Sequence, residues 1–306
     1  MQERMKEEGP SQRPSRTQIW LMASRPKTLY AALAPVLAGA AIGYAAGGFQ
    51  PLPVLGALYC AVAIQIGTNL YNDAADFERG ADTHERMGPP RVTHAGYLSP
   101  RQVKLGSLLV FASAGLVGIG LVIHGGPVVL ALGLASILAG LAYTAGPFPL
   151  AYNGLGDPFV FLFFGFVAVC GTVYLQLGEV TLLAWLAGAM EGALITALLV
   201  VNNVRDFETD RAAGRRTIPA SLGRGAGVVE YGLMLALAYL LPVLMVMLAD
   251  SSLWVLLPLL SAPYAWWQVR DLQRLRGRAL NHTLEATARL ALIQAFLLSI
   301  GLLIGG

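Results

Sequence analysis

Two clusters of asparagine and aspartate residues hold the side chains of this chain that are best suited to chemistry. One cluster extends from residue 65 to 82 and the other from residue 202 to 217. On a helix with 100° per residue, the amides and carboxylates of each cluster fall within an arc of about 100°. The two arcs consist of Asn69, Asn72, Asp73 and Asp76, and of Asn202, Asn203, Asp206 and Asp210. Because the pattern occurs twice, we expect the two arcs to face each other across a cavity.

Carboxylates that face each other, together with amide oxygens, suit a hard cation such as Mg²⁺, which proteins usually bind with one or two carboxylates and substrate phosphate. Neither arc contains His or Cys, which argues against zinc and copper. A cation held there would neutralise the charge that develops when a C–O bond to diphosphate breaks. We predict a catalytic Mg²⁺ site at Asp73, Asp76, Asp206 and Asp210, with Asp82 as a further candidate ligand. The alternative is a set of polar residues solvated at two helix ends.

Several cations and amides near the clusters are candidates for holding a diphosphate. An Arg side chain can bind two phosphate oxygens at once, whereas Lys acts as a point charge. The alternative for each cation is that it only fixes the membrane topology or binds lipid head groups. The predicted substrate- and diphosphate-binding residues are Arg25, Lys27, Asn69, Asn72, Arg91, Tyr143, Asn202, Asn203 and Arg215.

The composition predicts the elements that position these residues. Of 306 residues, 56% are hydrophobic and 13% are charged, and the mean hydropathy is +0.60, whereas a soluble domain has about 25% charged residues. Apolar stretches near the roughly 20 residues that cross a bilayer recur along the chain. We predict an all-α polytopic membrane protein with nine transmembrane helices around a central cavity, at residues 29–47, 52–73, 104–123, 127–146, 157–177, 181–202, 228–248, 252–269 and 286–304.

The distribution of basic residues predicts the orientation. All 21 Lys and Arg residues lie in the N-terminal segment or near three of the connections, which nine spans place on one side. By the positive-inside rule this side is cytoplasmic, and both clusters lie on it. We predict a multi-pass protein of the cell (inner) membrane, with a disordered cytoplasmic tail at residues 1–18 and one transmembrane domain at 19–306. The net charge of +3 then reflects topology and not a nucleic-acid partner.

The chain resembles the UbiA superfamily of intramembrane prenyltransferases. The first signature of that family, Asn-Asp followed by a spaced Asp, matches Asn72, Asp73 and Asp76, and its second, two Asp four residues apart, matches Asp206 and Asp210. A closer similarity is to the members that prenylate 1,4-dihydroxy-2-naphthoate in menaquinone synthesis. The stretches that support it are residues 25–29, 65–82, 91–100, 149–156, 202–224 and 280–289. The family often has a basic residue where Phe148 stands and Lys where Arg215 stands.

The resemblance implies that a polyprenyl group passes from polyprenyl diphosphate to 1,4-dihydroxy-2-naphthoate. The reaction would lose CO₂ and diphosphate and give demethylmenaquinol, with Mg²⁺ assisting ionisation to an allylic cation. One alternative is a UbiA-type enzyme for another aromatic acceptor, such as 4-hydroxybenzoate or homogentisate. A second alternative, from another class, is a cation-coupled transporter, in which paired carboxylates line an ion pathway. The expected partners are the two substrates and the lipid bilayer, and nothing in the sequence indicates a protein partner.

Overall fold

Every regular element in residues 14–80 and 87–305, which the computed structural model describes, is helical. This confirms the all-α prediction. The elements are α1 (Arg16–Ser24), the 3₁₀ turn η1 (Pro26–Thr28), α2 (Tyr30–Ala45), α3 (Pro51–Glu78), α4 (Pro100–Ala142), η2 (Leu150–Tyr152), α5 (Gly156–Val160), the π-helical η3 (Phe161–Val167), α6 (Ala168–Leu177), α7 (Leu182–Arg205), α8 (Phe207–Ala212), α9 (Ile218–Leu222), α10 (Arg224–Leu248), the 3₁₀ helix η4 (Leu253–Ser261), α11 (Ala262–Arg274), η5 (Gly277–Ala279) and α12 (Leu280–Gly305).

Short sequence signals fix several helix starts. α1 begins with a capping box. The Ser15 hydroxyl accepts a hydrogen bond from the backbone N–H of Gln18, and the Gln18 side-chain oxygen accepts one from the backbone N–H of Ser15. The pair satisfies two backbone N–H groups that the helix leaves without partners. Ser99 and Gln102 form the same box at the start of α4. Because α1 begins at Arg16, residues 16–18 are helical. The prediction of a disordered tail was therefore wrong for these three residues, and residues 1–13 lie outside the described part.

The element α4 is a hairpin of two helical arms. Gly126 interrupts it with a φ of 73° and a ψ of −161°, a backbone conformation open mainly to glycine, and Pro127 follows. Gly140 on the second arm lies against Phe111 on the first arm and Thr68 on α3, so the arms run back along each other. The predicted spans at 104–123 and 127–146 correspond to these two arms.

Six helices have the length and apolar composition to cross a membrane, or up to seven if the pair α1–η1 and α2, bent by 53°, counts as one span. The six are α3, α4, the continuous run from α5 through α6, α7, α10, and η5 with α12. The chain is therefore a multi-pass helical membrane protein. The finer prediction of nine spans divides α4 at Gly126 and adds the run from η4 to α11, which begins as a 3₁₀ helix.

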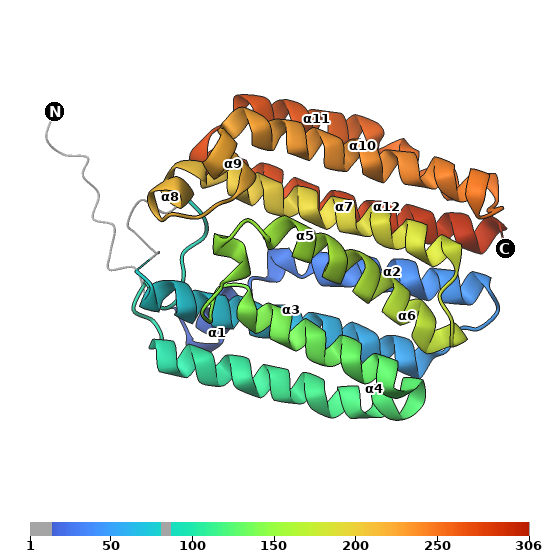
Figure 1. The fold of residues 1–306 in the computed structure, drawn as a ribbon, viewed down its shortest axis with the longest axis horizontal. Coiled ribbons are helices and arrows are strands. Elements are labelled where there is room, and N and C mark those ends of the chain that lie inside the picture. Colours follow the sequence, from blue (N-terminus) through green and yellow to red (C-terminus); the bar gives the residue numbers. More distant parts are fainter. Residues whose placement is uncertain (1–13, 81–86, 306) are drawn as a thin grey trace, which may run out of the picture.

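Helix α7 lies in the centre of the bundle and packs against α10, η3, α12 and α2. Figure 1 shows it between α10 and the run from α5 to α6. In the most apolar 18-residue stretch of α7, 78% is buried inside the protein, compared with 11% of the corresponding stretch of α3. Small residues permit this packing, because a side chain at Gly165 of η3 would meet the Gly188 carbonyl of α7 at 2.4 Å. Figure 1 shows α1, α8 and α9 at one end of the bundle, and both Asn/Asp clusters belong to that end.

Candidate active site

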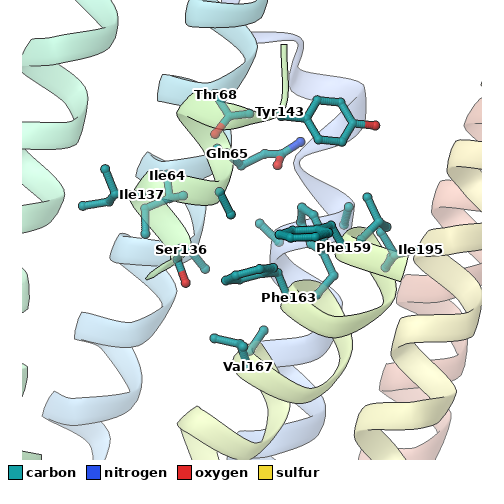
Figure 2. A pocket seen from close by; sticks show the side chains of 18 of the residues that line it. Ile64, Gln65, Thr68, Ser136, Ile137, Tyr143, Phe159, Phe163, Val167 and Ile195 are labelled. Atoms are coloured by element: carbon teal, nitrogen blue, oxygen red, sulfur yellow. The ribbon is translucent and has the colours of Figure 1, made fainter. Parts of the chain in front are cut away.

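A cavity of about 630 Å³ opens between α2, α3, α4, the run from α5 to α6, and α7. One end is polar, and the rest is lined by apolar residues. Figure 2 shows part of the apolar region, with Phe159 and Phe163 one below the other and Tyr143 above them. Of the predicted site residues, those that line the cavity are Arg25, Asn69, Asn72, Asp76, Arg91, Tyr143, Asn202, Asn203 and Arg215.

Asp76 is the acidic centre of the polar end. Its carboxylate is 1% exposed and accepts from the Arg91 guanidinium at 2.5 Å and from the Arg215 guanidinium at 3.2 Å. The Tyr152 hydroxyl donates to it at 3.0 Å, and Arg215 also lies over the Tyr152 ring, 4.4 Å from the centroid. Two guanidinium groups therefore meet at this end of the cavity, and their N–H donors suit the oxygens of a polyanion.

Arg215 connects the two predicted clusters. Its second terminal nitrogen lies 3.4 Å from the Asp210 carboxylate, so one guanidinium spans Asp76 of α3 and Asp210 of α8. Burial raises the pKa of Asp210 to about 6, although Arg215 opposes the shift. Burial lowers the pKa of Arg215, but Asp76 and Asp210 raise it more, so that it lies above its ordinary value. The place between these two carboxylates therefore binds positive charge.

Asp73 has a different environment from Asp76. Its carboxylate accepts from the backbone amides of Val92 and Thr93 at 3.2 and 3.4 Å, and from the Thr93 hydroxyl. Asp73 is 1% exposed and does not belong to the cavity lining. In this arrangement it anchors the segment that places Arg91 on Asp76, where Arg91 also donates to the Asn72 carbonyl at 3.2 Å.

Asp206 is held by the residue before it. The Arg205 guanidinium donates to both Asp206 oxygens at 2.8 and 2.5 Å, and to the Asn202 side chain at 2.6 Å. Arg205 also donates to Asn281 at 2.7 Å, which connects the end of α7 to α12. Asp206 is thus the partner of a buried cation, and it lies outside the cavity lining.

The remaining candidates differ in what they contact. Asn69 donates to the Ser24 carbonyl and the Thr28 hydroxyl, both at 3.1 Å, and so holds the bend beside Arg25. Asn72 accepts from the Thr144 hydroxyl at 2.6 Å. Lys27 pairs with Glu285 and is 67% exposed, outside the cavity. The predicted ligand Asp82 lies outside the described residues.

The residues at the polar end of the cavity meet some of the requirements of a site for a hard cation. Within the described ranges, no three His, Cys, Asp or Glu side chains come close enough together to hold a metal ion by themselves. The donors at the polar end are carboxylate and amide oxygens, however, and Asp76 and Asp210 already share a positive group. Such a pair of carboxylates fits Mg²⁺ when substrate phosphate supplies further oxygens.

The model of the UbiA prenyltransferase family matches residues 32–300. The chain belongs to this family. Family membership makes it a prenyl-transferring enzyme, and it confirms the resemblance seen in the sequence motifs.

Similar UbiA proteins support this assignment. The 1,4-dihydroxy-2-naphthoate octaprenyltransferase of Escherichia coli (strain K12) is 35% identical over 298 residues, which cover 95% of this chain and 97% of that protein. The enzyme of the same name from Bacillus subtilis (strain 168) is 30% identical over 300 residues, covering 96% and 94%. A UbiA homolog from Archaeoglobus fulgidus bound to GPP and Mg²⁺ superposes with a TM-score of 0.69 at 17% identity, covering 92% and 99%. That last similarity shows the UbiA fold alone.

Sequence reasoning missed three residues of this UbiA site. Thr93 and Arg205 hold Asp73 and Asp206, and Asp157 at the start of α5 lines the cavity. Arg205 was visible as a cation next to an acidic residue. Asp157 gave a clearer signal, because it is a lone acid at the entry to a long apolar run, and such residues are functional candidates.

Proposed function

We propose that this enzyme transfers a polyprenyl group from polyprenyl diphosphate to 1,4-dihydroxy-2-naphthoate, releasing CO₂ and diphosphate. The names of the relatives that match almost the whole chain support this acceptor. The observation that favours the reaction most is the shape of the cavity, in which Arg91 and Arg215 surround Asp76 at one end and apolar side chains continue from there. A diphosphate fits the first part and a polyprenyl chain the second.

Asp76 and Asp210 are the residues that would hold Mg²⁺ together with diphosphate oxygens. The bound ion would neutralise charge on the leaving group. Asp73 and Asp206 remain proposed ligands as well, but each must first release its present partners, Thr93 and Arg205. Until then these two carboxylates hold the residues that frame the polar end.

The chain's own residues orient the reaction. Arg91 and Arg215 bind the diphosphate, whose C–O bond breaks to leave an allylic cation in the apolar part of the cavity. The ring carbon of the naphthoate then forms a bond to that cation, and the carboxylate leaves as CO₂. Closure of the cavity against water matters here, because water would otherwise capture the cation. Arg25, which also lines the cavity, would attract the acceptor's carboxylate.

In the proposed orientation, the protein lies in the cell (inner) membrane and this polar end is on the cytoplasmic side. The segments that contain Arg25, Arg91 and Arg215 all reach the same cavity end, and cytoplasmic loops are rich in Arg and Lys. Nine proposed spans would put the connections that contain these arginines on that side. This count treats the two arms of α4 as separate spans and includes the run from η4 to α11.

An acceptor competition tests the function. Purified full-length protein receives farnesyl diphosphate, Mg²⁺ and equal concentrations of 1,4-dihydroxy-2-naphthoate, 4-hydroxybenzoate and homogentisate, and the products are separated by chromatography. We expect prenylation of the naphthoate with release of CO₂. Prenylation of another acceptor alone would refute the acceptor while leaving the family reaction in place.

A further inference from the structure

Asp157 lines the same cavity as Arg91 and Arg215. It lies in the first turn of α5 and is 9% exposed. The Asn203 side chain of α7 donates to its Oδ1 at 3.3 Å. The Tyr143 hydroxyl approaches the same turn, within 3.3 Å of where a side chain on Gly156 would begin. Asp157 therefore belongs to a polar group formed by three different elements.

The charge environment separates Asp157 from the other acids of the cavity. Asp76 has two arginine partners and Asp210 has one. Within residues 14–80 and 87–305, no Lys or Arg forms an ion pair with Asp157, and the side chain that donates to it is the neutral Asn203 amide. A carboxylate without a cation repels a diphosphate, so this wall suits a ligand that donates a hydrogen bond.

Two aromatic rings line the same cavity as this carboxylate. Phe159 and Phe163 are 5.8 Å apart between ring centroids with an interplanar angle of 20°. Figure 2 shows them facing the space between η3 and the side of Ile64 and Ile137. Their faces can pack against a flat aromatic molecule. The combination of aromatic rings with a hydrogen-bond acceptor fits an aromatic compound that has a hydroxyl group.

We propose that Asp157 is the acceptor-side base of this enzyme: it accepts a hydrogen bond from a ring hydroxyl of the aromatic acceptor and takes its proton during prenyl transfer. The inference deepens the proposed function and rests on it. Asn203 donates to Oδ1, and we assign Oδ2 to the hydroxyl. The acceptor's own carboxylate then points away from Asp157 and toward Arg91 or Arg215, because like charges repel and opposite charges attract.

The proton that Asp157 takes up is returned to the product within the same reaction. As the ring carbon bonds to the allylic carbon, the C–O electron pair leaves with diphosphate, and the hydroxyl proton moves to Asp157, leaving a ring carbonyl. When the carboxylate leaves as CO₂, its C–C electron pair restores the aromatic ring, and the carbonyl oxygen recovers the proton from Asp157. The base is regenerated, and no further oxidant, reductant or proton donor is needed.

Direct binding measurements test the proposal without turnover. Full-length protein is loaded with Mg²⁺ and inorganic diphosphate, and the Kd values of 1-hydroxy-2-naphthoate, 4-hydroxy-2-naphthoate and 2-naphthoate are measured from their fluorescence. In the wild-type protein, at least one hydroxyl compound should bind about tenfold more tightly than 2-naphthoate, as expected for a hydrogen bond to a charged group. In Asp157→Asn this advantage should fall below about twofold, because the amide presents a donor once Oδ1 is held by Asn203.

Turnover separates this proposal from the proposed function. With farnesyl diphosphate and dihydroxynaphthoate, Asp157→Asn should lose about 100-fold in kcat with the KM for farnesyl diphosphate within twofold. Asp157→Glu should recover at least a tenth of the wild-type kcat. Asp250→Asn, at an exposed aspartate outside the cavity, is the matched control, and Asp157→Ser replaces the asparagine variant if that fails to fold.

An unchanged hydroxyl advantage in Asp157→Asn would overturn the assignment, and so would a selective loss of affinity for farnesyl diphosphate. A wild-type enzyme that ignores dihydroxynaphthoate would instead refute the proposed acceptor. The hydroxyl comparison remains valid in that case, because it measures binding alone.

Discussion

The substitution Asp76→Asn removes the negative charge that Arg91 and Arg215 share. The pair with Arg91 is buried, with side-chain exposures of 2% for Asp76 and 7% for Arg91, and loss of one partner from a buried pair costs about 3–5 kcal/mol. Because Asp76 borders a cavity that water can enter, and Asn still accepts one hydrogen bond, we expect a loss of about 2 kcal/mol in the free energy of unfolding. We expect kcat to fall by about 100-fold or more, because the diphosphate site loses its central carboxylate.

Glu78→Gln is the matched control, two residues further along α3. Glu78 pairs with Lys104 at 2.6 Å, but the two side chains are 46% and 34% exposed, and exposed pairs contribute about 0–1 kcal/mol. Product formation from farnesyl diphosphate and dihydroxynaphthoate is measured by chromatography, and stability by the fraction of protein that elutes as a single species after heating. Equal activity in Asp76→Asn and the wild type, or equal loss in Glu78→Gln, would refute the reasoning.

Three further predictions concern the metal, the loop and the packing. Chelation with EDTA should abolish prenyl transfer, excess Mg²⁺ should restore it and Na⁺ should not, as measured by product formation. Thr93→Val should lower kcat about tenfold while the protein still elutes as one species, because the Asp73 anchor loses its hydroxyl donor. Gly301→Ala should unfold at lower temperature than the wild type, because its methyl would lie 2.1 Å from the Trp254 carbonyl oxygen, whereas Gly232→Ala, with open space around it, should not.

The sequence predicted the helices well because lipid leaves few alternatives. A segment that crosses a bilayer must satisfy its backbone internally and present apolar side chains, and hydropathy reports both requirements. It could not predict where a helix continues beyond the apolar stretch. α3 extends to Glu78, five residues past the expected end, because the segment after Arg91 covers its polar last turns through Thr93 and Asp73. That cover depends on contacts between residues about 20 positions apart.

The site could be predicted as a set of residues but not as an arrangement. Helical periodicity placed Asp73 and Asp76 on one arc, yet Asp73 binds a loop while Asp76 faces the cavity. An arc of about 100° is wide enough to contact two different neighbours. The pairing of Arg215 with Asp76 spans 139 positions, a relation that no spacing rule contains. Asp157 was missed because it belongs to neither repeated cluster.

The helices around the cavity differ in how deeply they are buried in the bundle, and this difference affects how such enzymes diversify. α7 forms one wall from the centre of the bundle, and 78% of its most apolar stretch is buried. The corresponding values for α3 and α4 are 11% and 22%. A larger side chain on α7 must displace tightly packed helices on its far side. The same change on α4 displaces fluid lipid. Variation in the length of the prenyl chain is therefore most accessible to evolution, and to engineering, through the arms on either side of Gly126, while the chemistry at Asp76 stays intact.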